Sequence, residues 1–310
     1  MMPHNKLWPV NEMWGEHDWT LGNDATLKAI EAYGAPTGIE DFCRKAQMVN
    51  MEVFKAIYEA WNDRMWNDCT GVMIWMSNPA WLSLTWNTYD YYQQPTAAFF
   101  ACRKACEPIH IQWNAATNSV KVVNCTCHEL NGLNAEATIY NLDSSVFQTK
   151  PAHLDCPANS TGECMTLFDG IDDNLSDVHF IRLTLRSDSN ELLSSNFYWR
   201  SKAEWKYQGL QNLKQAHLTY HVSAMKGGKF TVDVTNPSSA IALMIRFKLV
   251  DPATNMLLAP IFYSDNYFSL APNESCHVGI SIERVQHPGT AKLIAEGWNI
   301  ATSELIDVQG

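Results

Sequence analysis

The stretch Gly71-Val72-Met73-Ile74-Trp75-Met76-Ser77-Asn78-Pro79-Ala80-Trp81 is the most informative part of this 310-residue sequence. It begins as a nearly unbroken apolar run after a polar loop, which is typical of a strand covered on both faces in a parallel sheet or barrel. Apolar residues at three- and four-residue steps predict a helix over 41–61, and Pro95 opens a second predicted helix over 96–106. The order helix, buried strand, aromatic loop, helix indicates a βα unit of a (β/α)8 barrel.

Short alternating apolar runs, separated by Asn, Asp, Ser, Gly and Pro, begin near Pro108. They predict strands over 109–113, 120–125, 135–140, 146–149, 178–185, 192–199, 218–224, 230–235, 242–250, 275–282 and 291–300. Two antiparallel β-sandwiches of about 100 residues each fit this pattern and have the size of immunoglobulin-like domains. We therefore expect three domains, with residues 1–107, 108–205 and 206–310 as their extents.

The charge balance and the hydropathy argue against two classes of partner. With 22 basic and 33 acidic residues, the formal net charge is −11. Nucleic acid and anionic membranes bind to surfaces with a positive electrostatic field, and no basic patch can dominate the field of this chain. No apolar run is long enough for a transmembrane helix, and the N-terminus lacks the apolar core of a signal peptide. We expect no nucleic-acid and no membrane partner, and the compartment stays open, a periplasmic or secreted parent protein included.

The loop after the apolar run carries residue types suited to sugars, and we nominate Trp75, Ser77, Asn78 and Trp81. Aromatic rings cover the apolar C–H faces of a sugar, while amide and hydroxyl side chains bond its hydroxyl groups. At the C-terminal end of a barrel strand this loop would lie on the active-site face. The alternative is that the aromatics only pack the loop against the next helix, and we favour it for Trp86 and Tyr91 but not for Trp75.

These residues also carry a family resemblance, together with the segments Asp90-Tyr91-Tyr92, Lys104-Ala105 and Glu107-Pro108-Ile109-His110-Ile111-Gln112. The pattern resembles the barrel end of the exo-β-D-glucosaminidase branch of glycoside hydrolase family 2, with weaker similarity to β-mannosidases. Thr235-Asn236-Pro237-Ser238-Ser239-Ala240 is similar to the C-terminal immunoglobulin-like domain of the same enzymes. The resemblance implies a multidomain chain: the C-terminal end of a (β/α)8 TIM barrel (partial, about strand eight with flanking helices), followed by two immunoglobulin-like antiparallel β-sandwiches.

The resemblance further implies a retaining exo-β-glycosidase that hydrolyses terminal β-linked hexosides, glucosamine- or mannose-like. Retention needs two carboxyl groups about 5–5.5 Å apart, and the resemblance puts both glutamates upstream of this chain. We therefore expect no catalytic residue here and an inactive isolated chain. Asn11-Glu12 resembles the pair that marks the acid/base, but too few residues precede it to form a barrel strand. The resemblance instead places this stretch in a loop at the rim of the pocket, where Trp14, Glu16 and His17 could contact the substrate in the intact enzyme.

No cofactor and no metal site are expected. Cys125-Thr126-Cys127-His128 has zinc-ligand types but no second pair at suitable spacing. The expected partners are an oligo- or polysaccharide substrate in the intact enzyme and either an upstream barrel half or a second copy that covers the apolar faces of residues 1–107. The alternative function is a non-catalytic carbohydrate- or partner-binding β-sandwich module.

Overall fold

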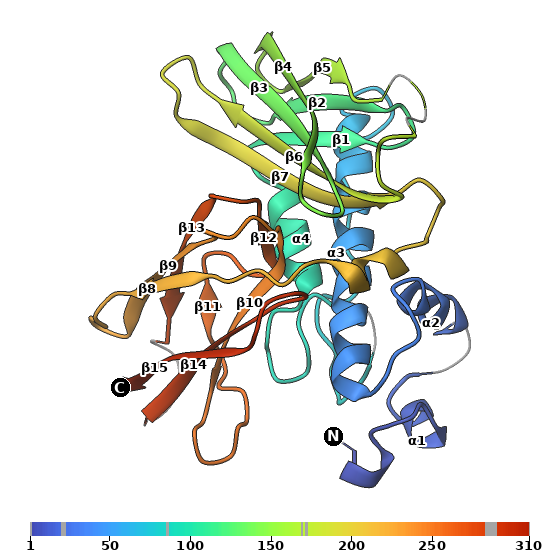
Figure 1. Ribbon diagram of the computed structural model, residues 1–310, viewed down its shortest axis with the longest axis vertical. Helices are drawn as coiled ribbons and strands as arrows, with labels where there is room; N and C mark the ends of the chain where they lie inside the picture. The colour runs from blue at the N-terminus through green and yellow to red at the C-terminus, as the bar shows by residue number, and fades with distance from the viewer. Residues whose placement is uncertain are drawn as a thin grey trace.

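The computed structural model describes residues 2–19, 23–84, 87–168, 170, 173–282 and 290–309, so Trp86 lies outside the described residues. Its helices are η1 His4–Lys6, α1 Glu12–Gly15, α2 Asn23–Glu31, α3 Ile39–Asp63, α4 Ala97–Ala105 and η2 Gln208–Asn212. The helices predicted over 41–61 and 96–106 are confirmed as α3 and α4. Figure 1 shows α3 running the length of the molecule, with α1 and α2 near its N-terminal end.

The apolar run 71–76 does not form the buried strand that its sequence predicts. Its residues have no strand assignment, and all of them are exposed or half-buried. Ahead of Ile109 the described residues contain only isolated bridges, such as Met65 with Cys69. Strand structure needs neighbouring backbone partners, and the described part of the chain places none beside this run. The expectation of a covered strand is therefore wrong for the chain on its own.

Strands β1 to β7 form the first sandwich, at the C-terminal end of α3 (Figure 1). A three-stranded sheet has the order β1-β2-β5 and a four-stranded sheet the order β4-β3-β6-β7. The bounds are β1 Ile109–Asn114, β2 Ser119–Asn124, β3 Leu130–Asn141, β4 Val146–Cys156, β5 Ser160–Thr166, β6 Val178–Arg186 and β7 Leu192–Ser201. The two sheets enclose a core that includes Ile111, Val122, Ile139 and Leu183, all fully buried.

Strands β8 to β15 form the second sandwich, which lies beside α4. Its sheets have the orders β12-β10-β14-β15 and β11-β13-β9-β8. The bounds are β8 Thr219–Val222, β9 Lys229–Thr235, β10 Ala242–Val250, β11 Phe262–Tyr263, β12 Phe268–Leu270, β13 Ser275–Ser281, β14 Thr290–Glu296 and β15 Ser303–Gln309. All the strand pairs in both sandwiches are antiparallel. The chain is therefore mostly β-sheet with few helices, as immunoglobulin-like sandwiches require.

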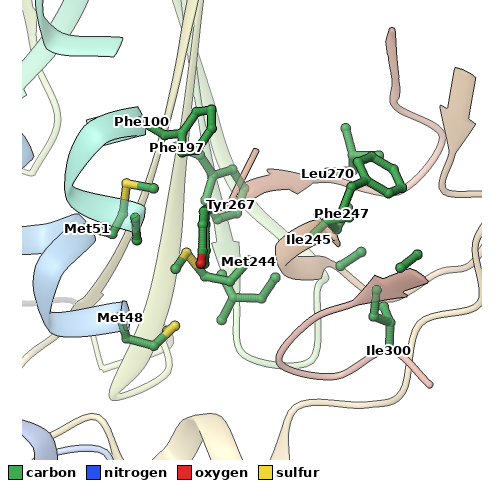
Figure 2. Close-up of a cluster of buried hydrophobic side chains, with 14 of the residues drawn as sticks. Met48, Met51, Phe100, Phe197, Met244, Ile245, Phe247, Tyr267, Leu270 and Ile300 are labelled. Carbon is green, nitrogen blue, oxygen red and sulfur yellow. The ribbon is translucent and has the colours of Figure 1, made fainter. Parts of the chain in front are cut away.

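One hydrophobic core joins the helices to both sandwiches, as Figure 2 shows. Met48 and Met51 of α3 and Phe100 of α4 belong to it, together with Phe197 of β7 and Tyr267 near β12. Because apolar burial contributes about 25 cal/mol per Å², this shared core holds the helices against the sandwiches without a complete barrel. The described helices of residues 1–107 therefore pack on the sandwiches.

No helix among the described residues is long and apolar enough to cross a membrane. The cysteines are free, including Cys156 at the end of β4 and Cys164 within β5.

Candidate functional site

Side-chain exposure alternates over 72–75. Met73 is 96% exposed and Trp75 79%, whereas Ile74 between them is 39% exposed and Val72 is half-buried. A two-residue period of this kind is typical of a β-strand. The alternation ends at Met76, which has a φ of +63°, and no strand among the described residues pairs with the run.

Two separate segments of the predicted site lie side by side. The Leu82 carbonyl lies 2.7 Å from Nδ1 of His17, and the backbone N–H of Leu84 donates to the His17 carbonyl at 2.8 Å. The carbonyl of Ser77 accepts from the backbone N–H of Tyr89 at 3.0 Å and from the Thr88 hydroxyl at 2.8 Å. The two bonds of His17 hold the aromatic loop against the segment after α1, and those of Ser77 close the loop on itself.

The nominated side chains differ in accessibility. Trp81 is half exposed, and Ser77, Asn78 and Glu16 are exposed; His17 is half-buried. Trp14 is only 2% exposed, and its ring packs edge-on against Trp19 at 5.5 Å and Phe42 at 5.1 Å. Because Trp14 is buried, it cannot contact a ligand in this arrangement. Its role here is to support α1. The structure therefore brings together the other nominated residues around the loop but not Trp14.

A cavity of ≈ 380 Å³ lies between the aromatic loop, α4 and the second sandwich. Ser77 and Asn78 line it on one side. The remaining lining residues were missed by sequence reasoning and are Tyr89, Gln93, Pro95, Phe99, Phe100, Arg103, Pro260, Ile261, Phe262 and Tyr263. Arg103 donates from Nη1 to the Tyr263 carbonyl at 3.1 Å, which ties α4 to β11. No local sequence pattern links residues so far apart, so only the tertiary contact reveals this wall.

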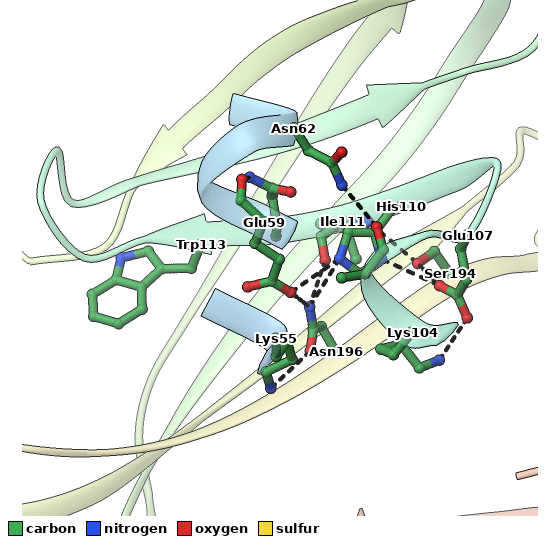
Figure 3. Close-up of polar contacts among 12 residues, drawn as sticks. Lys55, Glu59, Asn62, Lys104, Glu107, His110, Ile111, Trp113, Ser194 and Asn196 are labelled. Atoms are coloured by element: carbon green, nitrogen blue, oxygen red, sulfur yellow. Dashed lines mark hydrogen bonds and ion pairs between the residues drawn. The ribbon is translucent and has the colours of Figure 1, made fainter. Parts of the chain in front are cut away.

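The segment Lys104–Gln112, which carries part of the family resemblance, is structural. Glu59 of α3 accepts hydrogen bonds from Nδ2 of Asn196 at 2.7 Å and the Tyr198 hydroxyl at 2.9 Å, and pairs with Nε2 of His110 at 3.0 Å (Figure 3). Glu107 pairs with Nζ of Lys104 at 2.6 Å and with Nδ1 of His110 at 3.3 Å. We call these residues, with Lys55 and Ser194, the Glu59 network.

Burial and charge act against each other in the Glu59 network. Burial lowers the pKa of His110, but hydrogen bonds to Glu107 and Glu59 outweigh it and raise the pKa above 6.5. Burial opposes ionisation of Glu59, yet its bond with His110 and the charge of Lys55 bring the pKa below its ordinary value. Burial also lowers the pKa of Lys55 to about 8. His110 is fully buried and cannot reach a substrate, and the network fixes α3 and α4 to the first sandwich.

The described residues offer no candidate metal centre, since no group of three or more His, Cys, Asp or Glu side chains among them could hold an ion. Cys125 and Cys127 are exposed, and the Cys127 sulfur lies 3.3 Å from Nε2 of its neighbour His128. Two such ligands do not make a closed tetrahedral zinc site.

Comparisons with known proteins agree on one group of enzymes. Residues 196–300 match the Exo-beta-D-glucosaminidase Ig-fold domain. The chain is 30% identical to the mannosylglycoprotein endo-beta-mannosidase of Lilium longiflorum, over 87% of this chain and 35% of that protein. It is also 30% identical to the exo-beta-D-glucosaminidase of Hypocrea jecorina (80% and 31%) and to that of Amycolatopsis orientalis (91% and 30%). The chain thus spans about a third of the length of these curated relatives.

Solved structures show the same architecture. The Amycolatopsis orientalis exo-chitosanase CsxA, in a complex with PNP-beta-D-glucosamine, matches 98% of this chain and 40% of its own, with a TM-score of 0.83 and 26% identity. The beta-D-mannosidase of Dictyoglomus thermophilum matches 97% of this chain and 35% of its own, with a TM-score of 0.78. At 18% identity the second likeness concerns the fold alone. Both matches include the helices and the aromatic loop, since they cover nearly the whole chain.

Proposed function

We propose that the chain is the C-terminal portion of a retaining exo-β-glycosidase. The proposal rests on the correspondence of the chain, in sequence and fold, to the C-terminal part of glycoside hydrolase family 2 enzymes of the exo-β-D-glucosaminidase and β-mannosidase branch. Its substrate class is terminal β-linked hexosides, glucosamine- or mannose-like. Exo-action is part of the proposal, because the relatives named above include one endo-acting enzyme.

The proposed role of residues 1–107 is to close the catalytic (β/α)8 barrel, with 71–76 as its eighth strand. The observation that carries this role is the alternation along that run, with Met73 and Trp75 much more exposed than Ile74 between them. A strand in a closed barrel pairs along both edges, so the run requires two neighbours from an upstream barrel half. Residues 108–205 and 206–310 are the sandwiches that support this half.

In the assembled enzyme the aromatic loop forms part of the substrate cleft. Trp75 and Trp81 present rings to the apolar face of a sugar, and Ser77 and Asn78 bond its hydroxyl groups. His17, held to the Leu82 carbonyl, contributes the facing side of the rim. The supporting observation is that His17 is bonded to Leu82 and Leu84 of the aromatic loop although it lies far from them in the sequence.

The isolated chain is inactive in this proposal, because the catalytic glutamate pair belongs to the upstream half. The test is hydrolysis of p-nitrophenyl β-D-glucosaminide and β-D-mannoside by the 310-residue chain, alone and together with an upstream polypeptide. We expect turnover only in the second case. The Glu12→Gln and Glu16→Gln variants serve as controls, since both residues are exposed carboxylates near the loop. Turnover by the purified chain alone contradicts the proposal, and turnover that survives both substitutions places the catalytic pair elsewhere in this chain.

A further inference from the structure

The C-terminal half of α3 has the reverse of the usual polarity of a surface helix. Its buried residues include four charged side chains, each between 4% and 9% exposed: Glu52, Lys55, Glu59 and Asp63. Its exposed residues over the same turns are all apolar: Val53, Ala56, Ile57, Ala60 and Trp61. A surface helix normally turns apolar residues inward and charged residues outward. We call the five exposed residues the α3 stripe.

The first sandwich accounts for the buried charges. Lys55 donates from Nζ to the Phe197 carbonyl at 2.6 Å, and Glu59 accepts from Nδ2 of Asn196 at 2.7 Å. Figure 3 shows Lys55 and Glu59 reaching from α3 toward Asn196. The polar side of this half of α3 is therefore committed to the sandwich, and the apolar stripe is the side that remains uncovered.

The large side chains of the α3 stripe share one face of the helix. Val53, Ile57 and Trp61 follow one another at four-residue steps and are 37%, 41% and 43% exposed. The two alanines of the stripe lie between them and leave room for a partner to approach closely. The N-terminal turns of the same helix expose Glu40 and Arg44 instead. The apolar exposure is thus confined to the half of α3 that leads into the run 71–76.

Exposed apolar residues continue along the chain beyond the stripe. Trp66 is 51% exposed, and Met73 and Trp75 of the run 71–76 are more exposed still. Apolar surface of this extent marks a contact with another protein body. The stripe and the run therefore need an occupant that covers a helix face and supplies strand partners together.

A second copy of the chain does not meet both needs. Three partly exposed side chains offer far less than the roughly 800 Å² per partner that a stable interface buries, so the stripe alone cannot hold a dimer. In a two-fold dimer the run 71–76 pairs with its own copy along one edge and leaves the other edge open.

An upstream barrel half meets both needs. The helices of a (β/α)8 barrel form a ring around its strands, and the faces of a parallel sheet that they cover are apolar. Strands of that half also pair both edges of the run 71–76. The chain spans about a third of the length of its curated relatives, so the remainder of such a protein is long enough to supply these elements.

We propose that the α3 stripe is the docking surface for the apolar strands and helices of the upstream barrel half. This inference rests on the proposed function and deepens it, because it adds to the run 71–76 a second contact, made by side chains of a helix. Ile57 lies at the centre of this contact and Trp61 at its C-terminal end.

The test is binding of the full chain to the polypeptide encoded upstream of it, measured by calorimetry. Ile57→Asp places an unpaired charge in the apolar contact and should weaken binding at least about a hundredfold. Trp61→Ala removes the largest ring of the stripe and should weaken it about tenfold. The matched control is Val146→Asp, which should bind as the native chain does, because Val146 is 58% exposed but lies on β4 of the first sandwich.

A second measurement does not depend on a variant that changes the contact. In the native chain labelled with fluorotryptophan, the Trp61 signal, assigned with Trp61→Phe, should shift when the upstream polypeptide binds. The proposal is overturned if the native chain does not bind, if the Trp61 signal stays in place in the complex, or if Val146→Asp weakens binding as much as Ile57→Asp. A dimer of the chain alone that Ile57→Asp dissociates assigns the stripe to a second copy and overturns the proposal as well.

Glycosidase turnover, recorded in the same samples, separates this inference from the proposed function. A complex that forms through the stripe but cleaves neither p-nitrophenyl glycoside contradicts the proposed function and leaves the docking surface standing. An active complex that Ile57→Asp forms with native affinity contradicts the docking surface and leaves the proposed function standing.

Discussion

Replacing Glu59 by alanine tests whether the Glu59 network holds the helices to the first sandwich. The carboxylate is 6% exposed and makes three contacts across the junction, to His110, Asn196 and Tyr198. After Glu59→Ala, Asn196 keeps a bond to the Ile111 carbonyl at 3.1 Å and His110 keeps Glu107 at 3.3 Å, whereas the Tyr198 hydroxyl loses its acceptor. Lys55, buried nearby, also loses its strongest interaction with an opposite charge.

The magnitude follows from these losses. Removing one partner of a buried charged pair costs about 3–5 kcal/mol, and each orphaned buried donor costs about 1–3 kcal/mol, an overlapping rather than additional amount. We therefore expect Glu59→Ala to lower the free energy of unfolding by about 3–5 kcal/mol. Glu59→Gln keeps the shape and one acceptor oxygen, so its loss should be about 1–3 kcal/mol.

The assay is urea unfolding followed by far-ultraviolet circular dichroism and by tryptophan fluorescence, so that the junction and the sandwiches are observed separately. Glu304→Gln is the control, since its pair with Lys292 at 3.0 Å is exposed and should contribute about 0–1 kcal/mol. A loss below about 1 kcal/mol for Glu59→Ala, no larger than that of the control, would refute the interpretation of this network as the clamp between α3 and the first sandwich.

Three further predictions concern other parts of the chain. The pKa of folded His110 lies above 6.5, so the contribution of this residue to stability is complete below that pH and is lost as the pH rises through the folded pKa. Urea unfolding should show this loss of stability above about pH 6.5 in the native chain but not in the His110→Gln variant. Gly34→Ala should lower the free energy of unfolding by more than about 1 kcal/mol, because Gly34 has a φ of +98° and an added Cβ atom would lie 1.9 Å from Nε2 of Gln211. An unchanged midpoint of urea unfolding would contradict this prediction. The double variant Met73→Ser, Trp75→Ser should have a free energy of unfolding within about 0.5 kcal/mol of that of the native chain, yet self-associate less in sedimentation velocity. A large loss of stability would show that the run 71–76 is packed rather than open.

Elements with strong local periodicity were predictable from the sequence. The buried residues of α3, such as Phe42, Met48 and Val49, recur at helical spacing, and the prediction fell within two residues of both ends. The pair Gly227-Gly228, which favours a tight turn, forms one between β8 and β9, and both glycines have positive φ. In such segments local preference and tertiary packing favour the same conformation.

Other elements were missed because their signal is not local. Strand β5 contains Gly162 and polar residues and pairs only along β2, so it lacks an apolar run of its own. Asn131-Gly132 is a pair typical of tight turns, but it lies inside β3 at a register shift opposite β4. Gly132 has a φ of +63° there, and its N–H donates to Asp155 at 2.7 Å. The same positive φ serves a bulge as well as a turn.

The candidate site was predictable only in its exposed half. Trp75 and Asn78 follow from sugar chemistry, whereas the wall that includes Phe262 comes from a sandwich far along the chain. Glu59 and Asn196 carry no motif, and only their hydrogen bond reveals the network. The run 71–76 was predicted as a strand from its composition, but strand pairing depends on neighbours that the described residues do not supply.

Hydrogen exchange at the backbone amides of residues 72–76 tests most directly whether this run is built as a barrel strand. In the dilute chain alone we expect these amides to exchange rapidly, while those of β6 and β10 are protected. Once an upstream polypeptide that restores glycosidase turnover is bound, the same amides should become protected, because barrel closure pairs both edges of the run. Protection equal to that of β6 in the dilute chain, or rapid exchange that persists in the active complex, would contradict the account.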